Sequence, residues 1–175
     1  MRLYILIGGI EPLAFQQIED SADLIVFARE MEQTKRYFTF EVARFGADRV
    51  EMEMRIDPRV EDMLVPPFLL QPLVENAVRH AMPSEGKLTI EVTGEVTGND
   101  VIVRVCDNGV GMTEEARCNI LHPESSLGLG IAVKNVHDRI CGYFGPGTHM
   151  EVESELGKGT CVILVLKEGA LREYQ

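Results

Sequence analysis

The sequence predicts an α+β protein: a two-layer α/β sandwich with one mixed, mostly antiparallel sheet, helices on one face, and a helical segment in front. Two observations predict it. From Arg49 onward, strand-like alternation and helix-like periodicity follow each other along the chain. The 175 residues are 45% hydrophobic and 26% charged, which suits one substantial globular core. We expect a helical segment over 1–48 and an α/β domain over 49–175.

The first region has helical periodicity from about Pro12 to Phe45. Gly46 then ends the run, as expected of a C-terminal helix cap. Such an amphipathic helix either packs on its own domain or presents its apolar face to a partner, and the sequence leaves both open. The apolar residues recur at steps of about three and four: Leu24, Phe27, Ala28, Met31, Tyr37, Phe38, Phe40 and Val42.

The second region begins with a strand over Val50–Ile56, which alternates apolar and polar residues and ends at Asp57-Pro58. Pro66-Pro67 then predicts the start of a helix that runs to about His80. Further strands are expected over Lys87–Val96 and Asp100–Cys106, joined by a hairpin turn at Thr97–Asn99, a helix over Leu129–Tyr143, and strands over His149–Glu155 and Thr160–Lys167.

The net charge and the cysteine content limit the classes of partner that the chain can bind and the cellular compartment in which it works. A net charge of -11 argues against a nucleic-acid partner, and an anionic ligand would have to be held by backbone amides, a helix N-terminus or a metal ion. No segment is long enough to span a bilayer. The four cysteines show no metal-site spacing, so we expect them to be reduced and structural, as in a cytoplasmic protein: Cys106, Cys118, Cys141 and Cys161.

The most informative motif follows the apolar run from Val101 to Val105. The run ends in Asp107, and Gly109 and Gly111 come next at alternate positions. A carboxylate at the end of a buried strand can accept a hydrogen bond from the exocyclic amine of adenine. Glycines let the backbone come close to a flat ring because they have no Cβ. Alone, this motif is weak, because many such turns only reverse a strand.

A second motif lies on the helix expected before His80. Asn76 interrupts an apolar face, and its oxygen is suited to Mg²⁺, although a hydrogen-bonded core Asn is the alternative. Arg79 and His80 follow three and four residues later and could reach phosphate oxygens. A solvated surface cation is the other interpretation of Arg79.

Two glycine-rich turns complete the set. Gly128, Leu129 and Gly130 open the next helix, whose free amides could bind phosphate oxygens. The polar stretch over 112–126 has the composition of a flap that closes over a ligand. The turn Gly157–Thr160 places the hydroxyl of Thr160 at the start of a strand, or is only a hairpin turn.

Together these motifs closely resemble the ATP-binding domain shared by histidine kinases, type II topoisomerases, Hsp90 and MutL. The resemblance covers Arg49 to Lys167 and implies the Bergerat fold, ATP as ligand and Mg²⁺ as metal. It implies the following site: Asn76 on the metal, Arg79 and His80 facing the phosphates, Asp107, Gly109 and Gly111 at the adenine, Gly128, Leu129 and Gly130 in the lid, and Thr160 beside Asp107.

The segment from Val65 to Asn76 is similar to the LytS-type sensor histidine kinases. Their ATP-hydrolysing relatives carry a glutamate one turn before the Asn, where this chain has Pro72. The resemblance therefore implies phosphoryl transfer to a His and on to a response regulator, not rapid hydrolysis. It also implies a homodimeric, membrane-anchored kinase whose catalytic domain is cytoplasmic, with residues 1–48 as the remnant of its dimerisation and phosphotransfer region.

One departure from that family is the phosphoacceptor His, because none of the four histidines has its Asn-Pro-His-Phe context. No catalytic residue is assigned for this reason. Either the acceptor lies outside this chain, which we favour, or the phosphate goes to a partner, as in a stand-alone serine kinase of the anti-sigma-factor type. A non-catalytic domain in which nucleotide gates a protein interface is the third alternative.

Overall fold

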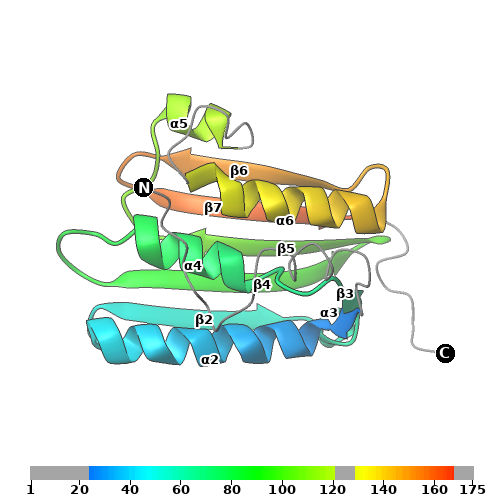
Figure 1. Cartoon of the computed structure of the whole chain (residues 1–175), viewed down its shortest axis with the longest axis horizontal. Helices are drawn as coiled ribbons and strands as arrows, with labels where there is room; N and C mark the ends of the chain where they lie inside the picture. Colours follow the sequence, from blue (N-terminus) through cyan, green and yellow to red (C-terminus); the bar gives the residue numbers. More distant parts are fainter. Residues whose placement is uncertain (1–23, 121–128, 168–175) are drawn as a thin grey trace, which may run out of the picture.

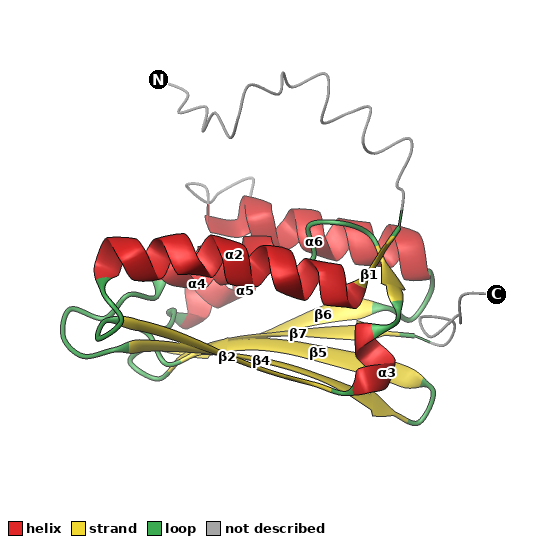
Figure 2. Cartoon of the chain, turned by 90° about the horizontal axis from the view of Figure 1, so that it is seen from below, coloured by secondary structure: helices red, strands yellow, loops and turns green. Residues whose placement is uncertain are grey.

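The computed structural model describes residues 24–120 and 129–167, which form helices and strands in two layers. Figure 1 shows helices α2 (Phe27–Phe45), α4 (Gln71–His80) and α6 (Leu129–Phe144) lying over one face of the sheet, roughly along its strands. Figure 2 shows the same helices together in one layer and the strands in the other. The predicted two-layer α+β architecture is confirmed.

Within the described residues, the main sheet has five strands in the order β2-β4-β5-β7-β6. The pairing of β2 with β4 is parallel, and the other neighbours are antiparallel. The sheet is therefore mixed and mostly antiparallel, as predicted. The parallel pair needs a crossover connection, and α4 lies in it. The strands span Val50–Ile56 (β2), Leu88–Thr97 (β4), Asp100–Asp107 (β5), His149–Glu155 (β6) and Gly159–Leu166 (β7).

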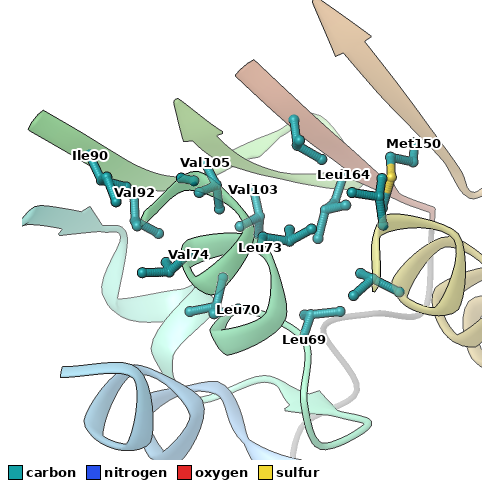
Figure 3. Packing of buried hydrophobic residues seen from close by; sticks show 14 of the residues in the cluster. Leu69, Leu70, Leu73, Val74, Ile90, Val92, Val103, Val105, Met150 and Leu164 are labelled. Atoms are coloured by element: carbon teal, nitrogen blue, oxygen red, sulfur yellow. The ribbon is translucent and has the colours of Figure 1, made fainter. Parts of the chain in front are cut away.

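The core lies between the sheet and the helices. Side chains alternate along a strand, so every second residue of the central strands faces the helices and is buried. The next position on that face of β5, after Val103 and Val105, is Asp107. Figure 3 shows α4 packed against these strands, with its apolar face in the core; the labelled residues include Leu70, Leu73, Val74, Ile90, Val92 and Leu164.

Helix α2 packs on its own domain through Phe27, Met31 and Phe38, which are buried. Gly46 ends it as predicted, with a positive φ of 98° and an amide that donates to the Val42 carbonyl. The start of the predicted helix was wrong. In the part that the structure describes, Ile25–Val26 form a short strand, β1, because they pair with β3 (Leu64–Val65). Residues 12–23 of that prediction lie outside the described residues.

Helix α4 begins at Gln71, not at Pro67 as predicted. Phe68 has a φ of 61°, a left-handed conformation that costs an L-residue about 1–2 kcal/mol and is incompatible with a continuous helix. The tertiary contacts of this turn, described below, hold it. Two short helices were not predicted: α3 (Pro58–Glu61), capped by Asp57, and α5 (Glu114–Asn119), capped by Thr113. None of the described helices is both long and apolar enough to cross a membrane.

The cysteine prediction was wrong for one pair. Cys106 of β5 and Cys161 of β7 lie directly opposite each other, and a disulfide joins them. They are 55 residues apart in sequence, so their pairing depends on the register of two strands and not on any local spacing. Cys118 and Cys141 are free.

Thiol labelling tests this pairing. We expect the denatured chain to take up two alkyl labels without a reductant, on Cys118 and Cys141, and four after reduction. Intact-mass spectrometry counts the labels. Four labels without a reductant would show that Cys106 and Cys161 are thiols in the purified protein.

Candidate functional site

A cleft of about 410 Å³, including its open mouth, lies between α4 and the ends of β5 and β7. Five predicted site residues line it, together with an apolar wall: Asn76, His80, Asp107, Gly111 and Thr160, with Leu73, Ala77, Ala81, Val105, Met112 and Val162. Residues from three segments far apart in sequence thus share one cavity.

Asp107 occupies the helix-facing end of β5, directly opposite Thr160 of β7. Its Oδ1 accepts hydrogen bonds from the amides of Gly109 at 2.9 Å and Thr160 at 3.2 Å. No described residue donates a hydrogen bond to Oδ2. Burial raises the pKa of Asp107, and the two amides lower it in part. The carboxyl group is therefore oriented through one oxygen, and the other remains an acceptor for a ligand.

Gly109 and Gly111 are required by close backbone packing. A Cβ on Gly109 would lie 2.0 Å from the Ala81 carbonyl oxygen at the end of α4, and the Val110 amide donates to the same oxygen. Gly111 has a φ of 65°, and its Cβ would lie 2.0 Å from the Glu155 carbonyl oxygen. The motif thus packs between α4 and the end of β6. Of the two, only Gly111 lines the cleft.

Asn76 lies on the face of α4 that lines the cleft, one turn from His80. No described residue forms a hydrogen bond with its side-chain amide, so the predicted alternative of a hydrogen-bonded core Asn finds no partner in that part of the chain. An unpaired amide oxygen at a cavity is available to a ligand or a cation. The described residues contain no cluster of three or more His, Cys, Asp or Glu side chains suited to a metal ion.

His80 and Arg79 differ in their position relative to the cleft. His80 lines the cleft, and its pKa is lowered by burial and by the charge of Arg79, so it is neutral at pH 7. Arg79 does not line the cleft, and its charge acts on Tyr37 of α2. Near a phosphate, His80 could donate a hydrogen bond, and the negative charge of the phosphate would raise its pKa again.

The predicted lid falls mostly outside the described residues. Gly128 lies there, as does the predicted flap beyond residue 120. Leu129 begins α6, and Gly130 is buried in its first turn. The first amides of a helix lack intrahelical partners, which agrees with the predicted phosphate-binding role without testing it.

Sequence reasoning missed Ser154 of β6. Its hydroxyl donates to the Gly159 carbonyl, accepts from the Met112 amide and contacts the Thr160 hydroxyl. Each of these three distances is 2.9 Å. Ser154 therefore connects the segment after Gly111 to the strand that carries Thr160. The signal was absent from the sequence, because the pairing of Ser154 with Thr160 depends on the β6–β7 register.

Comparison with known proteins agrees with this geometry. Residues 68–170 match the family described as histidine kinase-, DNA gyrase B-, and HSP90-like ATPase. The sensor protein LytS of Bacillus cereus is 36% identical over 156 residues, covering 87% of this chain and 26% of LytS. LytS of Bacillus subtilis is 36% identical over 141 residues, covering 78% of this chain and 23% of that protein. The chain thus spans about a quarter of the length of these relatives.

Solved structures show the same fold. The catalytic domain of histidine kinase ThkA superposes with a TM-score of 0.64 at 19% identity, covering 83% of this chain and 98% of that one. The mycobacterial sensor histidine kinase MprB gives a TM-score of 0.62 at 13% identity, covering 84% of this chain and 97% of that one. The resemblance inferred from the sequence motifs is confirmed: the chain belongs to the histidine kinase-, DNA gyrase B-, and HSP90-like ATPase family.

Proposed function

We propose that this chain is the catalytic domain of a LytS-type sensor histidine kinase, which transfers the γ-phosphoryl group of ATP to a His and then to an aspartate of a response regulator. Membership of an ATPase family implies that the chain binds ATP. The observation that carries the proposal is that Asp107, at the end of β5, and Asn76 of α4 line the same cleft. The relatives from Bacillus are named sensor proteins, and LytS of Staphylococcus aureus is named a sensor histidine kinase/phosphatase, which suggests the class of reaction.

Asp107 would read the adenine. Its Oδ2 would accept a hydrogen bond from the exocyclic amine, while Oδ1 stays bound to the amides of Gly109 and Thr160. The apolar wall of the cleft, with Val105 and Val162, would exclude water from the ring. Only a base with a donor at that position satisfies the free carboxylate oxygen, so the site would prefer adenine.

The phosphates would lie toward Asn76, His80 and the start of α6. Asn76 fits Mg²⁺, because this ion is often held by one or two protein oxygens together with phosphate oxygens and water. Bound there, the metal would neutralise phosphate charge. Leu129 and Gly130, with Gly128, would offer backbone amides to the phosphates, and Arg79 would reach them only from beside the cleft. Catalysis would consist mostly of positioning and charge neutralisation.

Transfer to a protein group is favoured over hydrolysis. Pro72 has no side chain that could activate water one turn before Asn76. Glu75, next to Asn76, accepts a hydrogen bond from Gln71 at 2.7 Å and does not line the cleft. The base that assists transfer would sit beside the acceptor His. We propose further that the intact kinase is a homodimer with this domain in the cytoplasm, that α2 belongs to its dimerisation region, and that any membrane contact lies in other segments.

Calorimetric titration with ATP, followed by transfer of labelled phosphate, tests the proposal. We expect micromolar to sub-millimolar binding that Mg²⁺ strengthens, and label on a separately supplied dimerisation hairpin that carries the acceptor His. Binding without any transfer would favour the nucleotide-gated interaction domain. Absence of binding, with and without Mg²⁺, would contradict the proposal.

Asn76→Ala tests the metal role. We expect it to remove the gain in ATP affinity that Mg²⁺ provides, about tenfold or 1.4 kcal/mol, and to leave metal-free binding unchanged. Asn99→Ala, an exposed Asn in the β4–β5 turn, is the matched control. Calorimetry with ATP, with and without Mg²⁺, measures both. An equal loss in the two conditions would count against metal coordination by Asn76.

A further inference from the structure

Glu30 is a buried carboxylate that the proposed chemistry does not use. It lies in the first turn of α2 and is 1% exposed. Its Oε1 accepts from the Phe68 amide at 2.7 Å, and its Oε2 accepts from the amides of Leu69 at 2.8 Å and Leu70 at 3.1 Å. Consecutive amides directed at one carboxylate, next to a helix N-terminus, form a strong anion site. Here the anion is supplied by another helix of the same chain.

The turn that Glu30 binds is also held from the other side. The Phe68 carbonyl accepts a hydrogen bond from Arg139 Nη1 of α6 at 2.9 Å. Phe68 itself has the left-handed φ of 61°, and a non-glycine residue keeps that conformation only where its surroundings impose it. The side chains of Leu69 and Leu70 extend into the core (Figure 3). Helices α2 and α6 therefore both bind the turn that begins α4.

This turn leads directly to the cleft. Asn76 lies six residues after Leu70, about 9 Å along the helix axis, and Leu73, Ala77 and His80 of the same helix line the cavity. A short helix moves as a rigid body, so a shift of its first turn displaces Asn76. The other end of α4 also contacts α2, because Glu75 and Arg79 lie close enough to act electrostatically on Tyr37.

We propose that Glu30 is a positioning residue: by binding the amides of Phe68–Leu70, it sets the placement of α4 and so of Asn76 in the nucleotide site. The proposal rests on the proposed function, since it assumes that ATP and Mg²⁺ occupy the cleft. It also makes α2 a regulatory element, because a shift of α2 relative to the sheet changes the position of Asn76. By reciprocity, ATP binding then strengthens the contact between Glu30 and the turn.

Glu30→Gln is the informative variant. It keeps the size of the side chain but replaces one accepting oxygen with an NH₂ group that faces amide donors. The matched control is Thr34→Val, on the same buried face of α2, because the Thr34 hydroxyl donates only to the Glu30 carbonyl of its own helix at 2.8 Å. Both variants remove buried polar contacts of α2, and only the first disturbs the α4 turn.

Calorimetry on the folded chains separates positioning from mere stability. We expect Glu30→Gln to weaken ATP binding with Mg²⁺ by about five- to tenfold, and Thr34→Val to leave it unchanged. In an Asn76→Ala background, the effect of Glu30→Gln should be smaller, because Asn76 is one of the α4 residues through which Glu30 acts on the cleft. Unchanged affinity in Glu30→Gln, or an equal loss in both backgrounds, would overturn the proposal. Absence of ATP binding by the unsubstituted chain would instead contradict the proposed function.

A measurement on the unsubstituted chain keeps the proposal testable if Glu30→Gln does not fold. We expect saturating ATP and Mg²⁺ to slow hydrogen exchange of the Phe68–Leu70 amides, observed by NMR, and Asn76→Ala to reduce this protection. The same amides exchanging at equal rates with and without nucleotide, in a chain that binds ATP, would show that the turn and the cleft are not coupled.

Discussion

Asp107→Asn is expected to weaken ATP binding by more than tenfold, which is at least about 1.4 kcal/mol. Two amides already donate to Oδ1, so the Asn side chain would keep its oxygen there to satisfy them. Its NH₂ group would then occupy the place of Oδ2 and face the exocyclic amine of adenine. The NH₂ group and the adenine amine are both donors, so the hydrogen bond that the Asp107 carboxylate accepted would be lost. Calorimetry with ATP measures the loss of affinity.

Base specificity gives this prediction a second measurement. Inosine triphosphate has a carbonyl where ATP has the amine, so the unsubstituted chain should bind it poorly and Asp107→Asn should reduce the difference. Asp100→Asn, at the other end of β5 and paired with Lys167, is the control and should leave both affinities unchanged. An unchanged preference for ATP in the Asp107 variant would show that another group reads the base.

The raised pKa of Asp107 adds a pH dependence with a defined sign. Only the ionised carboxylate is a pure acceptor, so ATP affinity should fall as pH drops through the raised pKa, and Asp107→Asn should lack this component. The folded-state pKa lies above the unfolded one, so ionisation of the free site costs folding stability as pH rises through that pKa, and protonation removes the cost. An identical pH profile in the two proteins would contradict the assignment.

Gly109→Ala is expected to lower the free energy of unfolding by about 1–3 kcal/mol or more. Its Cβ would lie 2.0 Å from the Ala81 carbonyl oxygen, a backbone atom that moves only if α4 and the loop separate. That separation would also lengthen the 3.0 Å hydrogen bond from the Val110 amide to the same oxygen. Because α4 carries Asn76, ATP affinity should fall as well. Chemical denaturation measures the stability.

Gly142→Ala is the contrasting substitution. It lies in α6, where the added Cβ would meet nothing within 4 Å beyond its chain neighbours and the backbone of its own helix, so the higher helix propensity of Ala should raise stability by about 0.5–1 kcal/mol. Opposite signs for the two glycines would show that packing, and not glycine content, decides the outcome. A neutral Gly109→Ala would mean that the loop does not rest on the end of α4 in solution.

Much of the fold follows from local patterns. The alternation over Val50–Ile56 and the hairpin turn after Thr97 are confirmed, and so is the end of α2 at Gly46. Each depends on residues adjacent in the chain: a side-chain period of two, a turn glycine, a helix cap. The motif order from Asn76 to Thr160 likewise identified the family before any contact was known. The roles of the individual site residues remain predictions.

Contacts between distant residues decided the rest. The parallel pairing of β2 with β4, the disulfide between Cys106 and Cys161, and the contact of Ser154 with Thr160 all follow from strand register. Helix α4 begins at Gln71, directly after a turn whose amides are bound by Glu30, a residue about forty positions earlier. Sequence by itself determined the strands of the main sheet, the central parts of the long helices and the family to which they belong, because those signals are periodic and local. Tertiary structure decided which side chains meet, because register and burial arise only when the segments pack.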